Sequence, residues 1–264
     1  MCKHNLFSFE KRGVYGIIHG DMNKLKKLLK GNTRICFLDF EGTQFSHEMI
    51  ALGAVFATLN PKTGRIKKSK DSFHVYVKAK NPIGNYVINL TGITQEKLNA
   101  EAVSFNDALI KLKKYIGLSF KKTSFMTFGS HDMRILNQSI SYNFTFPKDV
   151  CQQIQKFNID FSALANEFIR DDKGNPLSLV HLCELFEVKE AGPAHDARID
   201  AVNLMNVYDA FLEKRNLVLE NYLTILQKPN KHLPEPLGEA IAKLAKGETV
   251  TGKEFRDEVE KYLS

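Results

Sequence analysis

The chain has 264 residues, 43% hydrophobic and 25% charged, which is the ordinary range of globular proteins and enough for one full core with small additions. It has no apolar run near the roughly 20 residues that span a bilayer, and its first residues lack the apolar stretch of a signal peptide, so we expect a cytoplasmic protein. The formal charge of +7 favours polyanionic partners, because lysines that neutralise phosphates release counterions.

The cysteines and lysines further limit the kinds of protein and binding site that the sequence allows. Four cysteines, Cys2, Cys36, Cys151 and Cys183, are scattered without a close pair, which argues against a disulfide framework and a structural zinc site. The lysines gather in residues 24–27, 65–70 and 111–122. Each lysine group indicates either a solvated face or a surface that contacts a polyanion.

Residues 1–33 are predicted to form a helical lead-in, because Leu25, Leu28 and Leu29 lie at helical spacing. From residue 34 the pattern becomes that of strands. Residues 35–40 and 49–59 are apolar runs typical of strands buried on both faces, and residues 72–78 alternate in polarity. These three strands predict an antiparallel meander.

Helical periodicity follows over residues 105–116, with Ser104 as the N-cap. A short strand over residues 124–128 leads through Gly129 into a helix at 133–140. Further helices are expected over residues 159–168, 177–186 and 194–212. Strands in a block, followed by strands alternating with helices, predict an α/β fold with a mixed central sheet flanked by helices.

The last part of the chain differs in composition. Three prolines, Pro229, Pro234 and Pro236, separate two helical stretches over residues 217–227 and 238–246. We therefore divide the chain into the lead-in 1–33, a main domain 34–215 and a helical C-terminal appendage 216–264.

Two carboxylates, Asp39 and Glu41, stand at the end of the first strand. Residues i and i+2 of a strand project from the same face, so these side chains converge. Paired carboxylates flanked by apolar residues need a counter-charge, and Mg²⁺ or Mn²⁺, which prefer oxygen ligands, would supply it. A pair held by lysines or backbone amides at a wet strand end is the alternative.

A third carboxylate, Asp132, follows the strand 124–128 at a strand-to-helix turn. Ligands collect at such strand ends in α/β folds, so Asp132 is a candidate for the same site. It could equally cap the helix that follows.

The segment from Ala194 to Ala201 adds a histidine and a fourth carboxylate. His195 follows Gly192 and Pro193 near a helix entrance, and Asp200 lies about one turn into the helix. Histidine exchanges a proton near neutral pH, which suits a general base. Asp196 could share the face of Asp200, although a capping role suits it better. The other histidines, His4, His19, His47, His74, His131, His181 and His232, have no comparable setting.

Three segments together resemble the motifs of the DEDDh (DnaQ-like) superfamily of 3′-to-5′ exonucleases. They are Leu38-Asp39-Phe40-Glu41, Phe128-Gly129-Ser130-His131-Asp132 and His195-Asp196-Ala197-x-x-Asp200-Ala201. The first motif and the later run Leu90-Thr91-Gly92-Ile93-Thr94-Gln95 look most like the ERI-type branch, which trims RNA 3′ ends, and its bacterial KapD-like relatives. That branch usually has tryptophans around the second motif, whereas this chain has Phe128 and His131 there and no tryptophan.

The resemblance covers residues 34–213 and implies an RNase H-like fold. It also implies hydrolysis of the terminal phosphodiester of single-stranded RNA or DNA, RNA being slightly favoured, with release of 5′-mononucleotides. Asp39 would bridge two divalent cations, Mg²⁺ or Mn²⁺, with Glu41 and Asp200 on one and Asp132 on the other. His195 would accept the proton of the attacking water.

Three residues after the first motif are candidates for substrate binding. Gly42 and Thr43 could bring amide and hydroxyl groups to the terminal nucleotide, and Phe45 could stack on a base. For Phe45, ordinary packing is the alternative.

Other functions stay open. A catalytically inactive nucleic-acid-binding module would predict the loss of a carboxylate, and none is lost. A two-metal endonuclease would share the site and differ in its products, and residues 216–264 could carry a protein-interaction role. The oligomeric state does not follow from the sequence.

Overall fold

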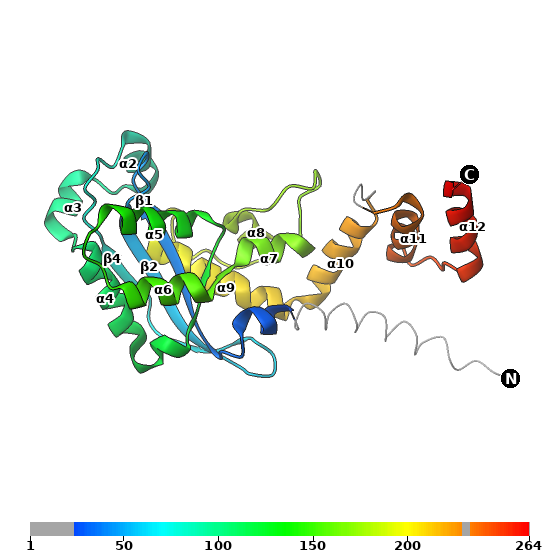
Figure 1. The fold of residues 1–264 in the computed structure, drawn as a ribbon, viewed down its shortest axis with the longest axis horizontal. Coiled ribbons are helices and arrows are strands. Elements are labelled where there is room, and N and C mark those ends of the chain that lie inside the picture. Colours follow the sequence, from blue (N-terminus) through cyan, green and yellow to red (C-terminus); the bar gives the residue numbers. More distant parts are fainter. Residues whose placement is uncertain (1–23, 229–232, 264) are drawn as a thin grey trace. The chain divides into compact units, whose positions relative to one another are not determined.

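The computed structural model describes residues 24–228 and 233–263, which form a six-stranded mixed sheet and a set of helices (Figure 1). The strands are β1 (Arg34–Gly42), β2 (Met49–Leu59), β3 (Ile66–Ser69), β4 (Phe73–Tyr76), β5 (Ser124–Thr127) and β6 (Asn158–Asp160). Their order is β3-β2-β1-β5-β6, with β4 also paired to β2. β2 is antiparallel to β1, β3 and β4, whereas β5 is parallel to β1 and β6 is parallel to β5.

The described residues also form a series of helices. They are α2 (Asn85–Thr91), α3 (Gln95–Glu101), α4 (Phe105–Ile116), the 3-10 helix η1 (Gly117–Lys122), α5 (His131–Tyr142), α6 (Lys148–Phe157), α7 (Phe161–Phe168), α8 (Leu179–Leu185), α9 (Ala197–Glu213), α10 (Arg215–Leu226), α11 (Glu235–Ala245) and α12 (Gly252–Leu263). Residues 24–29 are also helical. Within the described ranges, no helix combines the length and the apolar character needed to cross a membrane.

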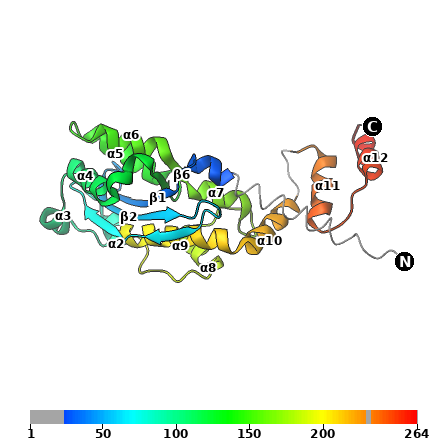
Figure 2. The ribbon, with the colours of Figure 1, turned by 90° about the horizontal axis from the view of Figure 1, so that it is seen from below.

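The alternation of β1 sorts its side chains between two helical layers. Cys36, Leu38 and Phe40 join the core formed with α4, α5 and α6, while Phe37 lies on the opposite face with its ring 5.3 Å from that of Tyr208 in α9. Figure 2 shows the sheet between α4, α5 and α6 on one side and α9 on the other. Asp39 and Glu41 share the face of Phe37, so they point toward the layer of α9.

A close approach between β2 and α9 brings that helix to the carboxylates. Gly53 pairs with Asp39 in the β1–β2 register. A Cβ atom on Gly53 would lie 1.9 Å from the carbonyl oxygen of Ala197, the first residue of α9. Glycine at this position therefore allows the first turn of α9 to rest on the sheet beside Asp39.

The chain divides into two compact units. The first contains residues up to 163 together with 178–213, and the second contains 164–177 and 214 to the end. In the second unit the ring of Phe168 packs against that of Tyr222 in α10, and Lys228 donates to the backbone oxygen of Asp172. This packing joins residues 164–177 to the C-terminal helices. The sequence, by contrast, predicts that residues 34–215 form one domain.

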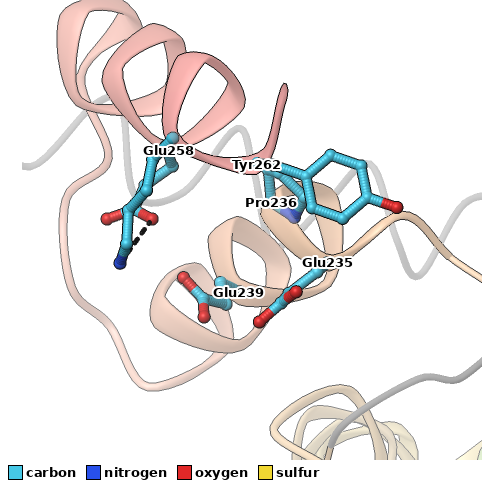
Figure 3. Close-up of a pocket in the computed structure, with 6 residues that line it drawn as sticks. Glu235, Pro236, Glu239, Glu258 and Tyr262 are labelled. Carbon is cyan, nitrogen blue, oxygen red and sulfur yellow. Dashed lines mark ion pairs between the residues drawn. The ribbon is translucent and has the colours of Figure 1, made fainter. Parts of the chain in front are cut away.

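A small pocket lies between α11 and α12 of the second unit (Figure 3). Glu235, Glu239, Glu258 and Tyr262 are among the residues that line it. Lys261 pairs with Glu258 at 3.8 Å, so part of the negative charge is balanced within the pocket.

The main strands and helices expected from the sequence are present. The second strand and the helix over residues 105–116 have the expected bounds, and the antiparallel arrangement of β1, β2 and β4 is confirmed. The helix predicted over residues 159–168 is present as α7 from Phe161, but residues 159 and 160 belong to β6, which pairs with β5. β3, α6 and α12 were not anticipated, and residues 1–23 of the expected lead-in lie outside the described residues.

Candidate active site

The end of β1 carries two half-buried carboxylates, Asp39 and Glu41. Burial raises the pKa of Asp39 well above its ordinary value, and the charges of Asp132, Glu41 and Asp200 raise it further. Burial likewise raises the pKa of Glu41 to about 8, with Asp200 and Asp132 as the nearest contributors. Carboxylates from distant parts of the chain therefore meet here in a poorly solvated place.

Asp132 is tied directly to β1. It lies in the first turn of α5, is only 4% exposed, and its Oδ1 accepts a hydrogen bond of 2.8 Å from the backbone amide of Phe40. Burial raises its pKa to about 7, and this amide partly offsets the rise. The capping alternative is wrong, since α5 begins at His131 after Ser130 and Asp132 reaches across to the strand.

The start of α9 supplies Asp200 and His195. Oδ1 of Asp196 accepts hydrogen bonds from the amides of Arg198 and Ile199, so Asp196 caps the helix, as the sequence suggested. Oδ2 of Asp200 accepts a hydrogen bond of 2.8 Å from the amide of His195. Burial raises the pKa of Asp200, and this hydrogen bond opposes the rise.

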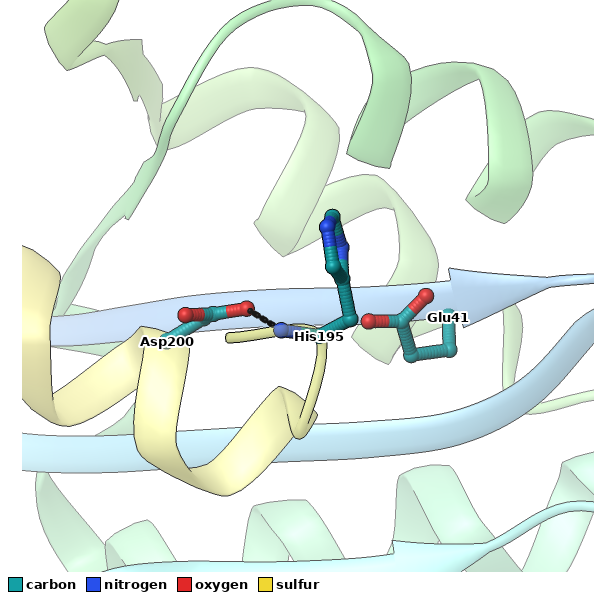
Figure 4. Close-up of side chains that lie close together, drawn as sticks. All are labelled: Glu41, His195 and Asp200. Atoms are coloured by element: carbon teal, nitrogen blue, oxygen red, sulfur yellow. Dashed lines mark hydrogen bonds between the residues drawn. The ribbon is translucent and has the colours of Figure 1, made fainter. Parts of the chain in front are cut away.

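His195 is exposed and has a φ of 64°, in the left-handed region that residues other than glycine rarely adopt. The hydrogen bond to Asp200 holds this backbone conformation, from which the exposed imidazole projects. Figure 4 shows its ring close to the carboxylates of Glu41 and Asp200. One ligand atom from each of these three residues lies within 4.8 Å of the others.

The donor set fits divalent cations. Four converging carboxylates need positive charge beyond the imidazole of His195, which lowers the pKa of Asp200, because burial disfavours their ionised forms. Carboxylate oxygens with one imidazole suit Mg²⁺ or Mn²⁺ better than soft metals. Glu41, His195 and Asp200 are the residues close enough to share one ion.

The loop after Glu41 only partly matches the expected substrate contacts. Thr43 is 1% exposed, its amide donates to the backbone oxygen of Glu48, and its hydroxyl contacts Ser46 and accepts from the amide of Glu48. Both groups proposed for a nucleotide are thus used inside the loop, which corrects that expectation for Thr43. Phe45 is 81% exposed and free to contact a ligand.

Gly42 stands where β1 meets α5. A Cβ atom there would lie 2.9 Å from the side chain of Ile135. Absence of a side chain keeps the strand end close to the helix that carries Asp132. Contact of Gly42 with a nucleotide remains a proposal.

Two histidines treated as ordinary surface residues lie together at the start of α5. The rings of His47 and His131 pack edge to face at 5.5 Å. Burial lowers the pKa of both, and the nearby guanidinium of Arg134 lowers both further. Two imidazoles and a guanidinium thus gather at the start of α5, which the distance of His47 from the other two in sequence did not reveal.

Two further acids were missed. Asp160, at the end of β6, accepts hydrogen bonds of 3.0 Å from the amides of Gly129 and Ala163 and so fixes the turn before α5. Glu48 is 1% exposed and accepts from the backbone and side-chain nitrogens of Asn81. Only a correct assignment of β6 would have indicated Asp160, and no pattern pointed to Glu48.

The family and structural comparisons agree with this geometry. The family model of RNase T exonucleases matches residues 36–208. The chain is similar to the nuclease domain of 3′hExo, a DEDDh family member solved with rAMP, with 24% identity, a TM-score of 0.54, and coverage of 69% of this chain and 93% of that one.

Two other solved structures are similar. A 3′-exonuclease whose structure shows 3′-end recognition of a histone mRNA stem-loop has 26% identity and a TM-score of 0.55, over 69% of this chain and 83% of that one. Exonuclease I of E. coli, in complex with a dT13 oligonucleotide, has 18% identity and a TM-score of 0.53, over 76% of this chain and 45% of that one. No curated protein sequence matches the chain.

These similarities confirm the RNase H-like fold and explain why divalent cations suit the site. The three motifs lie within the matched residues, and their carboxylates meet at one end of the sheet. The protein belongs to the RNase T family of exonucleases, within the DEDDh superfamily.

Proposed function

We propose that the protein is a metal-dependent exonuclease that removes nucleotides one at a time from the 3′ end of single-stranded nucleic acid, with RNA favoured over DNA. The observation that carries this proposal is the convergence of Glu41, His195 and Asp200 within 4.8 Å, beside the buried Asp39 and Asp132. The preference for RNA is supported by the resemblance to the ERI-type branch and by the similarity to a structure that recognises a histone mRNA.

In this proposal Asp39, Glu41, Asp132 and Asp200 hold two divalent cations. When bound, such ions supply Lewis-acid assistance to the attack on phosphorus and to the departure of the 3′ oxygen. His195 accepts a proton from the attacking water. A bond forms between the water oxygen and the terminal phosphorus, and the bond from phosphorus to the 3′ oxygen breaks. The products are a 5′-mononucleotide and a shortened strand whose new 3′ hydroxyl takes its proton from solvent.

The chain's own residues set up this reaction in two ways. Asp200 holds the backbone of His195 by the 2.8 Å hydrogen bond, so the proton acceptor stays at the mouth of the site. The exposed Phe45, and the cluster of His47, His131 and Arg134 beside Asp132, would contact the last base and a phosphate of the strand.

Product analysis tests the proposal. Equal sequences of 5′-labelled single-stranded RNA and DNA are incubated with Mg²⁺, Mn²⁺ or EDTA, using the wild type and the variants Asp39→Asn and Asp257→Asn. Asp257 is an exposed residue of α12 and serves as a matched control. We expect a ladder that shortens from the 3′ end in the wild type and Asp257→Asn, faster on RNA, and no ladder with EDTA or Asp39→Asn.

Other outcomes would replace the proposal. Internal fragments without a ladder would indicate an endonuclease. Retention of intact strands in a gel-shift assay, with no cleavage under any metal condition, would indicate an inactive binding module.

A further inference from the structure

The end of the sheet opposite the carboxylates carries a continuous group of lysines. They lie on and just after β3, at the end of α4 and on η1, and we call them the basic arc: Lys67, Lys68, Lys70, Lys114, Lys121 and Lys122. All six are exposed. Apart from Lys70, none has a partner for its ammonium group among the described residues, either an ion pair, a hydrogen bond or an aromatic ring.

Strand register places the basic arc at this end. Lys68 pairs with Thr58 of β2, and Thr58 pairs with Arg34, the first residue of β1. The helix η1 ends at Lys122, and one residue separates it from β5. The first residue of β5, Ser124, pairs with Ile35. The arc therefore lies level with the start of β1, whereas Glu41 is seven residues further along, about 23 Å away at about 3.3 Å per residue.

Contacts between side chains and the backbone join the three segments side by side. The Nζ atom of Lys70 donates to the backbone oxygen of Tyr115 at 2.5 Å and lies 5.2 Å from the ring of Phe56 and 5.3 Å from that of Tyr115. α4 runs directly into η1. Gln153 of α6 donates to the backbone oxygen of Lys121. Two aromatic rings and a backbone oxygen thus hold the ammonium group of Lys70, and the other five lysines of the arc are exposed.

Acidic residues are scarce around the basic arc. Asp149 is paired with Lys113 at 2.6 Å, so its charge is already balanced. At the start of β3, Asp209 and Glu213 pair with Arg65 at 2.7 Å and 2.9 Å, so their charges are balanced too, and Asp71 follows Lys70. Six exposed lysines with so little compensation repel one another, and an external polyanion would relieve that repulsion.

We propose that the basic arc binds the phosphate backbone of the same nucleic-acid strand whose 3′ end enters the carboxylate site. This inference rests on the proposed function for the identity of the strand, but not for the existence of the surface. A strand held at both ends of the sheet would stay bound after each terminal nucleotide is removed. Lysine contacts to phosphate make such binding independent of sequence and sensitive to salt.

The length of the RNA distinguishes contact with the basic arc from contact with the carboxylate site. Four stacked nucleotides span about 14 Å at about 3.4 Å each, which is short of the basic arc, whereas a thirty-nucleotide strand reaches it easily. The test variant is Lys68→Gln/Lys121→Gln/Lys122→Gln. Its control, Lys173→Gln/Lys246→Gln/Lys253→Gln, removes three positive charges from exposed positions outside the arc.

Binding is measured by fluorescence anisotropy with a thirty-nucleotide RNA in EDTA over a range of salt concentrations, and turnover with a four-nucleotide RNA. We expect the arc variant to bind the long RNA about tenfold more weakly at low salt. The slope of log affinity against log salt should become less negative by about 2, since each lost phosphate contact contributes about 0.7. Turnover of the short RNA and the behaviour of the control variant should match the wild type.

Two results would overturn the inference: equal binding by the arc and control variants, or an equal loss of short-RNA turnover and long-RNA binding in the arc variant. A wild type that binds the long RNA through the arc but cleaves neither RNA would refute the proposed function and leave the basic arc as a binding surface.

Discussion

The two ends of the central sheet carry opposite charges, and these charges differ in their exposure to solvent. At the carboxyl end of β1 and β5, Asp39, Glu41 and Asp132 converge in a partly or fully buried place, where burial raises the pKa of each. At the other end the lysines of the basic arc, on or next to β3, α4 and η1, are exposed.

This difference distinguishes the carboxylates, which take part in the proposed reaction, from the lysines, which attract a polyanion. Converging carboxylates oppose folding until a cation neutralises them, so the carboxylate end sacrifices stability to create a binding site. Solvated lysines cost folding little, and each contributes a small, independent share of affinity. One substitution at the carboxylate end should therefore reduce activity strongly. Each substitution in the basic arc should reduce affinity by a small amount.

The largest effect should come from Asp200→Asn. It removes a proposed metal ligand, so we expect the rate of mononucleotide release to fall at least about 10³-fold. Asp196→Asn is the matched control four residues earlier, because asparagine caps helices as well as aspartate and can still accept from the amides of Arg198 and Ile199. Activity of Asp196→Asn should stay within a few-fold of the wild type. An equal loss in both variants would show that helix geometry, and not the carboxylate of Asp200, carries the effect.

His195→Gln should have the next largest effect. Loss of the proton acceptor should slow turnover by about 10²-fold to 10⁴-fold. The four carboxylates remain, so Mn²⁺ binding measured by calorimetry should weaken much less than in Asp200→Asn. If metal binding fell as far as turnover, His195 would be acting mainly as a ligand, a role that its 4.8 Å grouping with Glu41 and Asp200 also permits.

Gly53→Ala tests the packing that brings the two halves of the site together. The added methyl would meet the carbonyl oxygen of Ala197 at 1.9 Å, so α9 must move away from β2. We expect a destabilisation of about 1–3 kcal/mol and a loss of activity of about tenfold, because Asp200 and His195 move with the helix. Gly252→Ala is the control, since nothing lies within 4 Å of its added methyl. Wild-type activity in Gly53→Ala would mean that the start of α9 tolerates displacement.

The parts predicted from sequence are those in which one local pattern decides the structure. The apolar run of β2 and the period of α4 gave their bounds correctly, and the two-residue spacing of Asp39 and Glu41 predicted that they share a face. β3 was missed because its sequence, Ile-Lys-Lys-Ser, has no apolar alternation, and pairing with β2 alone makes it a strand.

The parts that sequence reasoning missed depend on contacts between distant residues. His47 and His131 meet only because the loop before β2 lies against the start of α5. Asp160 was hidden by assigning residues 159–168 to one helix, although β6 occupies its start. The burial of Thr43 likewise depends on the return of the chain through Ser46 and Glu48, which no spacing indicates.

The smallest effect concerns stability without metal. When the pKa of an aspartate is raised in the folded state, the protein loses stability as the pH rises above the pKa of that aspartate in the unfolded chain. The reason is that the folded protein resists ionisation of this group. Asp39→Asn should therefore melt about 2–4 °C higher than the wild type in EDTA at pH 7.5, as expected for about 1 kcal/mol in a protein of this size. Below about pH 4 the difference should disappear, since Asp39 is then neutral in both states. Mn²⁺ should raise the melting temperature of the wild type but not of Asp39→Asn, and the exposed Asp257→Asn should follow the wild type throughout. A lower melting temperature for Asp39→Asn in EDTA would mean that Asp39 is stabilised by its surroundings, which would break the contrast between the two ends of the sheet.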